Sequence, residues 1–165
     1  MEEYRDIPGY EAKYMATSLG RIYSKARRIG KGSGYVMRGK ILKPSKDKDG
    51  YLHVALQIGG RKNKTYRVHR LIFNTFSPGV EYPAGFQICH KDGDKENNRE
   101  NNLYLGNQES NTLDKYKHKS TKLSIQQVKE IKKSTDLQRV VAKKYGITQA
   151  TVSRIKAGKR AKYIK

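Results

Sequence analysis

The sequence predicts an α+β protein, arranged as an elongated chain of small modules. Three observations favour this class. Short β-like runs broken by glycine fill the N-terminal part, two apolar runs around a polar loop predict a central strand–loop–strand–helix unit, and apolar residues at helical spacing mark the C-terminal part. Only 35% of the 165 residues are hydrophobic and tryptophan is absent, so the chain has few residues to fill the core of a single globular domain. We therefore expect three modules, 1–50, 51–111 and 123–165, with a basic linker at 112–122.

Residues 1–50 are expected to form an antiparallel β region. Their short apolar runs are separated by glycines, a pattern that is typical of strands and tight turns. Between Lys25 and Lys40 the chain is basic and rich in glycine, and this stretch includes Arg27 and Arg28. The composition is typical of either a flexible arm or a β-ribbon that lies along a polyanion.

A β-hairpin is predicted next, because apolar residues occupy every second position from Leu52 to Ile58. We expect its turn at residues 59–64. The turn carries three cations, Arg61, Lys62 and Lys64. Such a turn is suited to contacts with phosphate.

A short helix is predicted from Val68 onward, where the spacing of apolar residues changes to that of a helix. The pair Pro78-Gly79 ends this helix. We interpret His69 as a structural residue that packs the start of the helix, and Arg70 as a contact to a polyanion.

The central unit covers residues 88–111, which read ICHKDGDKENNRENNLYLGNQESN. His90 ends a short apolar strand, a polar loop follows, Asn102 opens the return strand, and Asn111 lies on the helix that comes next. The other asparagines of the loop are interpreted as turn residues, because asparagine tolerates left-handed backbone conformations. One imidazole acting as a general base, together with one divalent metal ion, is sufficient to cut a phosphodiester.

The C-terminal module is predicted to hold three short helices in a helix-turn-helix arrangement. The helices are expected at 125–133, 137–145 and 149–156. Ser124 and Gln127 form a capping box for the first helix, and Thr148 caps the third. Thr135 or Asp136 is expected to cap the second helix, with Val140, Val141 and Tyr145 mostly facing inward.

The charge of the chain favours a polyanionic partner, since 36 Lys and Arg stand against 15 Asp and Glu, for a net charge of +21. The excess is greatest from Lys115 onward, where 16 residues are basic and 2 are acidic. The sequence has no long apolar run for a membrane. Its single cysteine excludes an internal disulfide and a cysteine-based zinc site, and favours a reducing cytoplasm.

The motifs together resemble a known family. Residues 88–111 resemble the catalytic motif of the HNH, or His-Me finger, nucleases, which have a ββα-metal fold. Residues 3–24 resemble the small β module that precedes this motif in phage HNH homing endonucleases. Residues 50–76, with their Val-His-Arg-Leu signature, resemble the stretch that leads into the motif, and the helix-turn-helix resembles a DNA-binding module appended to many members. The four pieces occur in the order typical of the family.

The resemblance implies a metal-dependent, site-specific DNA endonuclease of the homing type that nicks double-stranded DNA as a monomer. It implies one Mg²⁺ or Mn²⁺ ion and no small-molecule cofactor, in a phage-encoded protein of the bacterial cytoplasm. By position, His90 matches the general base, Asn102 the residue that ties down the loop, and Asn111 a metal ligand. The residues expected to contact DNA are Arg27, Arg28, Arg61, Lys62, Lys64, Arg70, Gln149, Thr151 and Arg154, of which the last three are placed to read base edges.

One residue departs from the family. The position before the catalytic histidine is often an aspartate that binds the metal, but here it is Cys89. Either Cys89 is a core residue and Asn111 holds the metal with phosphate oxygens and water, or Cys89 ligates a softer ion such as Mn²⁺, because a thiolate is a poor ligand for Mg²⁺. A loop carboxylate, Asp92 or Asp94, is a third possible ligand.

Cys89 also keeps a second function open, that of a catalytically inactive, sequence-specific DNA-binding regulator. An RNA-binding protein is a third reading. The helix-turn-helix disfavours it, because a recognition helix does not fit the deep, narrow major groove of RNA.

Overall fold

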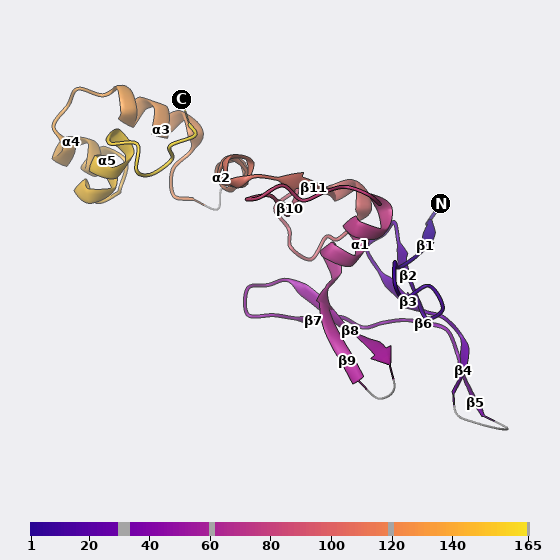
Figure 1. Ribbon diagram of the computed structural model, residues 1–165. Coiled ribbons are helices and arrows are strands. Elements are labelled where there is room, and N and C mark those ends of the chain that lie inside the picture. Colours follow the sequence, from indigo (N-terminus) through magenta and orange to yellow (C-terminus); the bar gives the residue numbers. More distant parts are fainter. Residues whose placement is uncertain (30–33, 60–61, 119–120, 165) are drawn as a thin grey trace. The chain divides into compact units, whose positions relative to one another are not determined.

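The computed structural model describes residues 1–29, 34–59, 62–118 and 121–164 (Figure 1). The chain divides into two compact units, Met1–Leu105 and Gly106–Lys165. Antiparallel strands dominate the first unit and helices the second, so the predicted α+β class is confirmed. The division falls just before α2, within the predicted strand–loop–strand–helix unit. The predicted four-part division into functional modules stays a prediction.

The N-terminal sheet has four antiparallel strands in the order β1-β2-β3-β6. They span Tyr4–Asp6, Tyr14–Thr17, Ile22–Ser24 and Lys40–Ile41. The alternation expected of a half-buried sheet is present, because Tyr14, Ala16 and Ile22 are buried. The turn between β2 and β3 is tight, and Gly20 adopts a φ of 82° there, where its amide donates to the carbonyl of Thr17.

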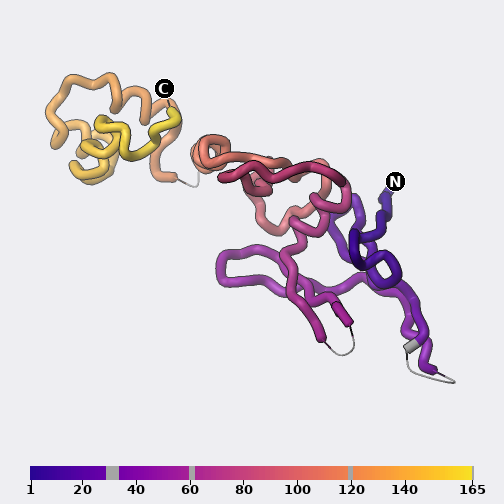
Figure 2. Tube along the Cα trace, in the orientation of Figure 1, coloured from indigo at the N-terminus to yellow at the C-terminus, as the bar shows by residue number. Residues whose placement is uncertain are grey.

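A separate two-stranded ribbon follows β3. Its antiparallel strands are β4, Arg27–Ile29, and β5, Tyr35–Met37. Figure 2 shows the chain leaving the N-terminal sheet for this ribbon and returning to it. Of the two predicted alternatives, a flexible arm and a β-ribbon, the described residues therefore form the ribbon.

The predicted hairpin is present as part of a three-stranded antiparallel sheet with the order β7-β8-β9, but its turn is shorter than the predicted 59–64, because Lys62 and Lys64 already pair with β8. The strands span Ser45–Lys46, Leu52–Gly59 and Lys62–Arg67. The predicted helix follows directly as α1, Val68–Phe76. Of the alternating apolar residues, Val54 and Leu56 are buried, but Ile58, at the far end of β8, is half exposed.

The last strands of the first unit are β10, Gln87–His90, and β11, Leu103–Gly106, which pair with each other. Asn102 does not open the return strand as predicted. It ends a short 3₁₀ helix, η1, at Glu100–Asn102, immediately before β11. One apolar core joins the N-terminal sheet, the hairpin, α1 and β11, and includes Ile22, Leu56 and Ile72.

The second unit contains α2 and a bundle of three shorter helices. The helices are α2, Gln108–Lys117; α3, Ile125–Lys133; α4, Gln138–Lys144; and α5, Gln149–Lys156. The predicted capping box of Ser124 and Gln127 is confirmed, and so is the cap of α5 by Thr148. Val128, Ile131, Val152 and Ile155 are buried in the core of this unit.

Two expectations for α4 are wrong. Leu137 occupies the N-cap position of α4 and makes no side-chain capping hydrogen bond, so neither Thr135 nor Asp136 is the cap. Val140 is 51% exposed, because this short helix turns only Val141 and Ala142 into the core. In the part of the chain that the structure describes, we find no helix suited in length and hydrophobicity to a bilayer.

Candidate active site

His90 lies at the C-terminal end of β10 and is 7% exposed. Its Nε2 is 3.2 Å from Oδ1 of Asn98, on the loop that follows. The Nδ2 of Asn98 donates to the carbonyl of Glu96 at 3.0 Å, which turns Oδ1 of Asn98 toward the imidazole. Because an amide oxygen only accepts, the neutral ring carries its proton on Nε2 and leaves Nδ1 as the basic nitrogen.

The protonation of His90 is controlled by its burial. Burial lowers the pKa of His90 below its ordinary value of 6.5, and the hydrogen bond with Asn98 and the nearby carboxylates of Asp92 and Asp94 oppose this in part. The imidazole is therefore neutral at neutral pH, as a general base must be.

Asn102 and Asp92 hold the loop between the two strands together. Nδ2 of Asn102 donates to Oδ1 of Asp92 at 2.9 Å and to the carbonyl of Asn97 at 2.8 Å, while its Oδ1 accepts the amide of Asp92 at 3.2 Å. Asn97 donates to the same carboxylate at 2.5 Å, and the amide of Asp94 donates to it at 2.9 Å. Although partial burial opposes it, these hydrogen bonds keep the pKa of Asp92 below its ordinary value. Both oxygens of Asp92 are thus used within the loop.

A second histidine, His69 on α1, lies against His90. The two ring centroids are 5.3 Å apart, and the ring of Tyr51 lies 5.1 Å from His69 and 6.2 Å from His90. His69 is 3% exposed, and its buried Nδ1 has no hydrogen-bond partner among the described residues. Burial, and then the proximity of His90 and of Arg67, lower the pKa of His69 to about 3.

The N-terminal sheet directly supports the loop that follows His90. The amide of Glu100 donates to the carbonyl of Ser18 at 3.0 Å. Gly20 packs so closely that a Cβ atom placed there would lie 2.5 Å from the backbone carbon of Asn98. The turn between β2 and β3 therefore fixes the backbone of the residue that holds His90.

The two residues considered as metal ligands, Cys89 and Asn111, belong to different units of the chain. Cys89 is buried on β10, and its Sγ lies 3.6 Å from the carbonyl of Gln87, to which it donates. Asn111 is partly buried on α2, in the second unit. Among the described residues, no group of three or more His, Cys, Asp or Glu side chains could hold a metal ion.

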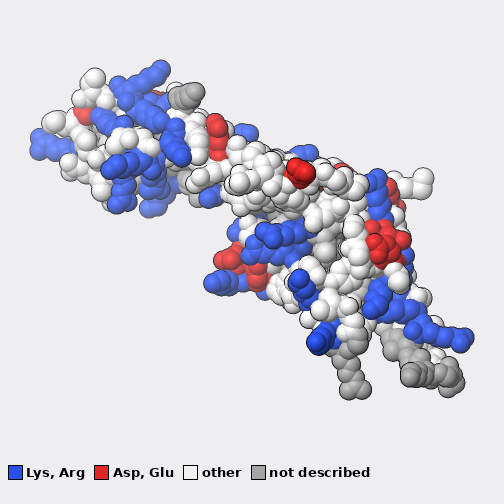
Figure 3. Space-filling view, viewed as in Figure 1, with Lys and Arg blue, Asp and Glu red and all other residues white. Residues whose placement is uncertain are grey.

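The residues predicted to contact DNA are mostly exposed. Arg28, Lys62, Lys64, Arg70, Gln149 and Arg154 are exposed, and Thr151 is half-buried. Arg27 is turned toward its own module, because its guanidinium donates to Oγ of Ser24 at 3.1 Å and lies over the ring of Tyr14. Arg61 lies outside the described residues. Figure 3 shows Lys and Arg side chains gathered on the visible face of the unit that holds α3 to α5.

Comparisons with known proteins place these features in one family. Residues 2–57 match the model of the NUMOD4 motif, and residues 66–113 match the model of an HNH endonuclease. The chain is 37% identical, over 131 residues, to "DNA endonuclease I-HmuI" of Bacillus phage SP01, and the match covers 79% of this chain and 67% of that relative. The chain belongs to the HNH endonuclease family.

Two further similarities agree with this assignment. An uncharacterised HNH endonuclease of Acanthamoeba polyphaga mimivirus is 28% identical over 163 residues, which cover 92% of this chain and 44% of that relative. A solved structure described as "DNA binding and cleavage by the HNH homing endonuclease I-HmuI" matches with a TM-score of 0.56 and 31% identity. It covers 96% of this chain and 91% of the other. The resemblance predicted from the motifs is confirmed.

HNH nucleases use a divalent metal ion, and the donor set of this HNH endonuclease suits a hard cation only in part. The amide oxygen of Asn111 is a suitable ligand for Mg²⁺ or Mn²⁺. The Cys89 thiol is a poor ligand for Mg²⁺, and its hydrogen is directed at Gln87. The Asp92 carboxylate is occupied by the loop.

Sequence reasoning did not foresee the contacts of three residues of this site. Asn98 was expected to be a turn residue, but it is 3% exposed and hydrogen-bonds to His90. His69 is buried as a structural residue should be, yet it also lies against His90. Asp92 was considered only as a metal ligand and is the acceptor that organises the loop. An unusual density of Asn and Asp after a histidine is the one signal that could have indicated a hydrogen-bonded loop.

We expect the stability of this HNH endonuclease to decrease as the pH falls below 6.5. The unfolded chain then takes up a proton at His69 that the folded chain does not bind until the pH nears about 3. This one group lowers the free energy of unfolding by up to about 1.4 kcal/mol per pH unit in that window. Urea unfolding at a series of pH values measures the slope. The variant His69→Phe should have a smaller slope than the wild type.

Proposed function

We propose that this HNH endonuclease cuts double-stranded DNA at a specific site and that His90 is the general base. The observation that carries the proposal is the buried, neutral imidazole of His90, held by Asn98 at Nε2 so that Nδ1 is left to accept a proton. The similarity to I-HmuI, whose solved structure is described as one of DNA binding and cleavage, supports DNA as the substrate.

In the proposed reaction, Nδ1 of His90 takes a proton from a water molecule while the water oxygen forms a bond to a backbone phosphorus. The bond from phosphorus to the 3′ oxygen breaks, and that oxygen leaves and takes up a proton from solvent. The products are a 5′-phosphate and a 3′-hydroxyl. Asn111 would help to hold a divalent ion, Mg²⁺ or Mn²⁺, and such an ion would stabilise the charge that develops on the phosphate and the leaving oxygen.

The other residues of the site act on His90 or on its loop. Asn98 fixes the tautomer and orientation of His90. Asn102 and Asp92 hold the loop in the shape that presents Asn98. Tyr51 and His69 pack against the imidazole and limit the access of water, which keeps its pKa low.

DNA binding is divided between the two units in this proposal. The exposed side chains of α5, Gln149 and Arg154, read base edges in the major groove. The ribbon of β4 and β5 and the exposed Lys62 and Lys64 of β9 contact the sugar–phosphate backbone. One active site per chain makes a monomer that nicks one strand, encoded by a phage and acting inside its bacterial host.

The proposal is tested by replacing Asn98 and measuring how cleavage depends on pH. Asn98→Asp places a carboxylate beside Nε2, which favours the charged imidazole, so the acid limb of the rate profile should move to higher pH. Asn98→Ala removes a hydrogen bond that raises the pKa of His90, so its acid limb should move to lower pH, with a lower rate on the plateau. If Asn98 had only a structural role, both variants would cut more slowly and the acid limb of the rate profile would stay at the same pH. That result would contradict the proposed role of Asn98 and weaken the assignment of His90.

A further inference from the structure

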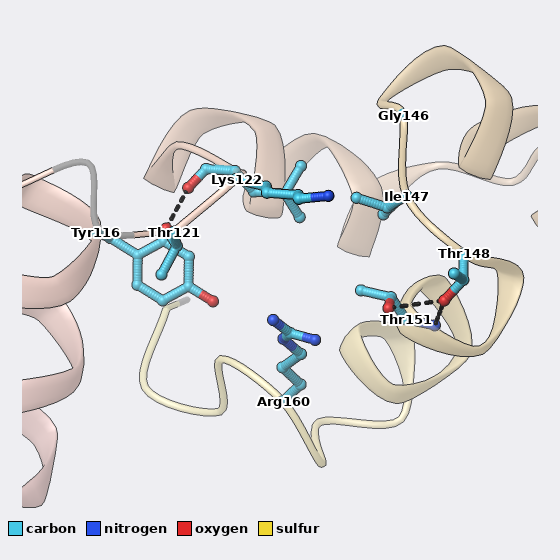
Figure 4. Close-up of a pocket in the computed structure, with 9 residues that line it drawn as sticks. Tyr116, Thr121, Lys122, Gly146, Ile147, Thr148, Thr151 and Arg160 are labelled. Carbon is cyan, nitrogen blue, oxygen red and sulfur yellow. Dashed lines mark hydrogen bonds between the residues drawn. The ribbon is translucent and has the colours of Figure 1, made fainter.

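The helical unit contains a pocket that the proposed cleavage chemistry does not use. Its volume is about 480 Å³, and it lies where the segment before α3, the turn before α5 and the chain after α5 meet. Figure 4 shows the guanidinium of Arg160 pointing into the space between Tyr116 and Thr151. All of its lining residues belong to the second unit, so the pocket is complete within that unit.

The pocket is cationic. Among the residues that the structure describes, Lys122 and Arg160 line it, and no acidic side chain does. Among the described residues, neither cation forms a salt bridge. Three carboxylates of the unit are engaged elsewhere, Asp114 with Lys117, Glu130 with Tyr145, and Asp136 with Ser134. Two exposed cations without a carboxylate partner favour an anionic ligand.

The pocket also contains hydroxyl groups that can donate hydrogen bonds. Oγ1 of Thr148 accepts the amide of Thr151 at 3.2 Å as the cap of α5, and the two threonine hydroxyls are 2.9 Å apart. That contact uses one of the two hydroxyl protons, so the other is available to a ligand. Both threonines line the pocket at the N-terminal end of α5, where the helix dipole also favours an anion.

The remaining walls are apolar. Tyr116 and Leu123 are buried, with 9% and 6% of their surface exposed, and Ile147 packs beside them. The pocket is much larger than a bare phosphate requires. A cationic, hydroxyl-lined cavity with an apolar wall is complementary to a phosphate that carries a sugar, which is the repeating unit of a nucleic-acid backbone.

We propose that this pocket binds one backbone phosphate of the duplex, with the adjacent deoxyribose against Tyr116 and Leu123. The inference rests on the proposed DNA-binding function. The planar fork of Arg160 forms two parallel hydrogen bonds to the phosphate, and Lys122 adds a point charge. The contact carries no sequence information. It anchors the start of α5 so that Gln149 and Arg154 are held in register with the bases.

The test measures DNA binding by the full chain at a series of salt concentrations, in EDTA so that no cutting occurs. The probe is a duplex selected from a random library by the wild-type protein. Arg160→Gln should weaken binding roughly tenfold. It should also reduce the slope of log affinity against log salt by about 1, because one phosphate contact is lost. Lys122→Gln should act in the same direction.

The matched control is Lys159→Gln, which removes the same charge one residue away, at an exposed position outside the pocket. Thermal unfolding of each variant shows whether the helical unit remains folded. If Arg160→Gln and Lys159→Gln have the same slope and affinity, the pocket does not hold a backbone phosphate. If Arg160→Gln and Lys122→Gln weaken binding to non-cognate DNA but not to the selected duplex, the anchoring role is also wrong.

Two further arms separate the possible failures. Arg154→Ala tests the recognition helix itself. If it abolishes sequence preference while Arg160→Gln has no effect, the proposed function stands and the pocket assignment fails. If the wild-type protein binds no duplex, both fail. Inorganic phosphate, titrated into the isotope-labelled full chain and followed by NMR, tests for a free-anion site. Saturable binding of phosphate with an unchanged salt slope in Arg160→Gln would overturn the proposal.

Discussion

His90→Ala should greatly slow DNA cleavage while leaving DNA binding intact. A general base contributes about 10²- to 10⁴-fold to the rate of a reaction, so the variant should cut slower by a factor in this range. Binding should not change, because His90 is buried and the cations proposed to contact DNA lie elsewhere. Single-turnover cleavage at saturating protein measures the chemical step, and a gel-shift assay in EDTA measures binding.

Since His90 packs in the interior, a second variant guards against loss of structure. His90→Gln keeps a side chain that hydrogen-bonds to Asn98 and lacks a basic nitrogen, so it should fold like the wild type and still fail to cut. His118→Ala, at an exposed position, serves as the matched control and should cut normally. Cleavage by His90→Ala at the wild-type rate would mean that the base is another group, and His69 would be the first to examine.

Gly20→Ala should reduce both stability and cleavage, although residue 20 is remote in sequence from the catalytic motif. Its φ of 82° is unfavourable for alanine, and the added Cβ would lie 2.5 Å from the backbone carbon of Asn98. We expect the free energy of unfolding to fall by roughly 2–3 kcal/mol. The cleavage rate should fall as well, because the displaced Asn98 no longer orients His90. Urea unfolding and single-turnover cleavage measure the two effects.

Gly9→Ala is the control that distinguishes the effect of backbone strain from the effect of a steric clash with Asn98. Gly9 has a similar φ of 77°, but a Cβ atom there would meet no heavy atom within 4 Å. Its substitution should lower stability by about 1 kcal/mol through backbone strain and leave the cleavage rate unchanged. Equal effects of the two alanines on cleavage would show that the turn at Gly20 does not support the catalytic loop.

Local structure was predictable where a short stretch of sequence decides it. The capping box at Ser124 and the cap at Thr148 depend on residues three positions apart, and both are present. The cap of α4 was not predictable in this way, because two polar residues before a helix compete with a neighbour, Leu137, that takes the N-cap position without a side-chain bond. The inward face of α4 depends on which residues the rest of the unit covers. The apolar spacing alone did not distinguish Val140 from Val141.

The candidate site was predictable only for the residues that belong to a motif. His90 and Asn102 were predicted from their places in the motif, and the side-chain hydrogen bonds that they make lie within one loop. The role of Asn98 depends on tertiary contacts, since Gly20 and Ser18 come from a different sheet and position the backbone on which Asn98 lies. His69 comes from α1, and its contact with His90 follows from the packing of that helix against β10. Periodicity identified the helix but gave no indication of what its second residue would touch.

The most direct test of the account is cleavage of a supercoiled plasmid that carries a selected binding site, incubated with the wild-type protein in Mg²⁺ and, separately, in Mn²⁺. We predict conversion to open circular DNA, with a nick at one fixed position that leaves a 5′-phosphate and a 3′-hydroxyl. A plasmid that is bound tightly and remains supercoiled with either ion would contradict the account. It would identify the chain as a DNA-binding protein that does not cut, with Cys89 as the residue to replace by aspartate first.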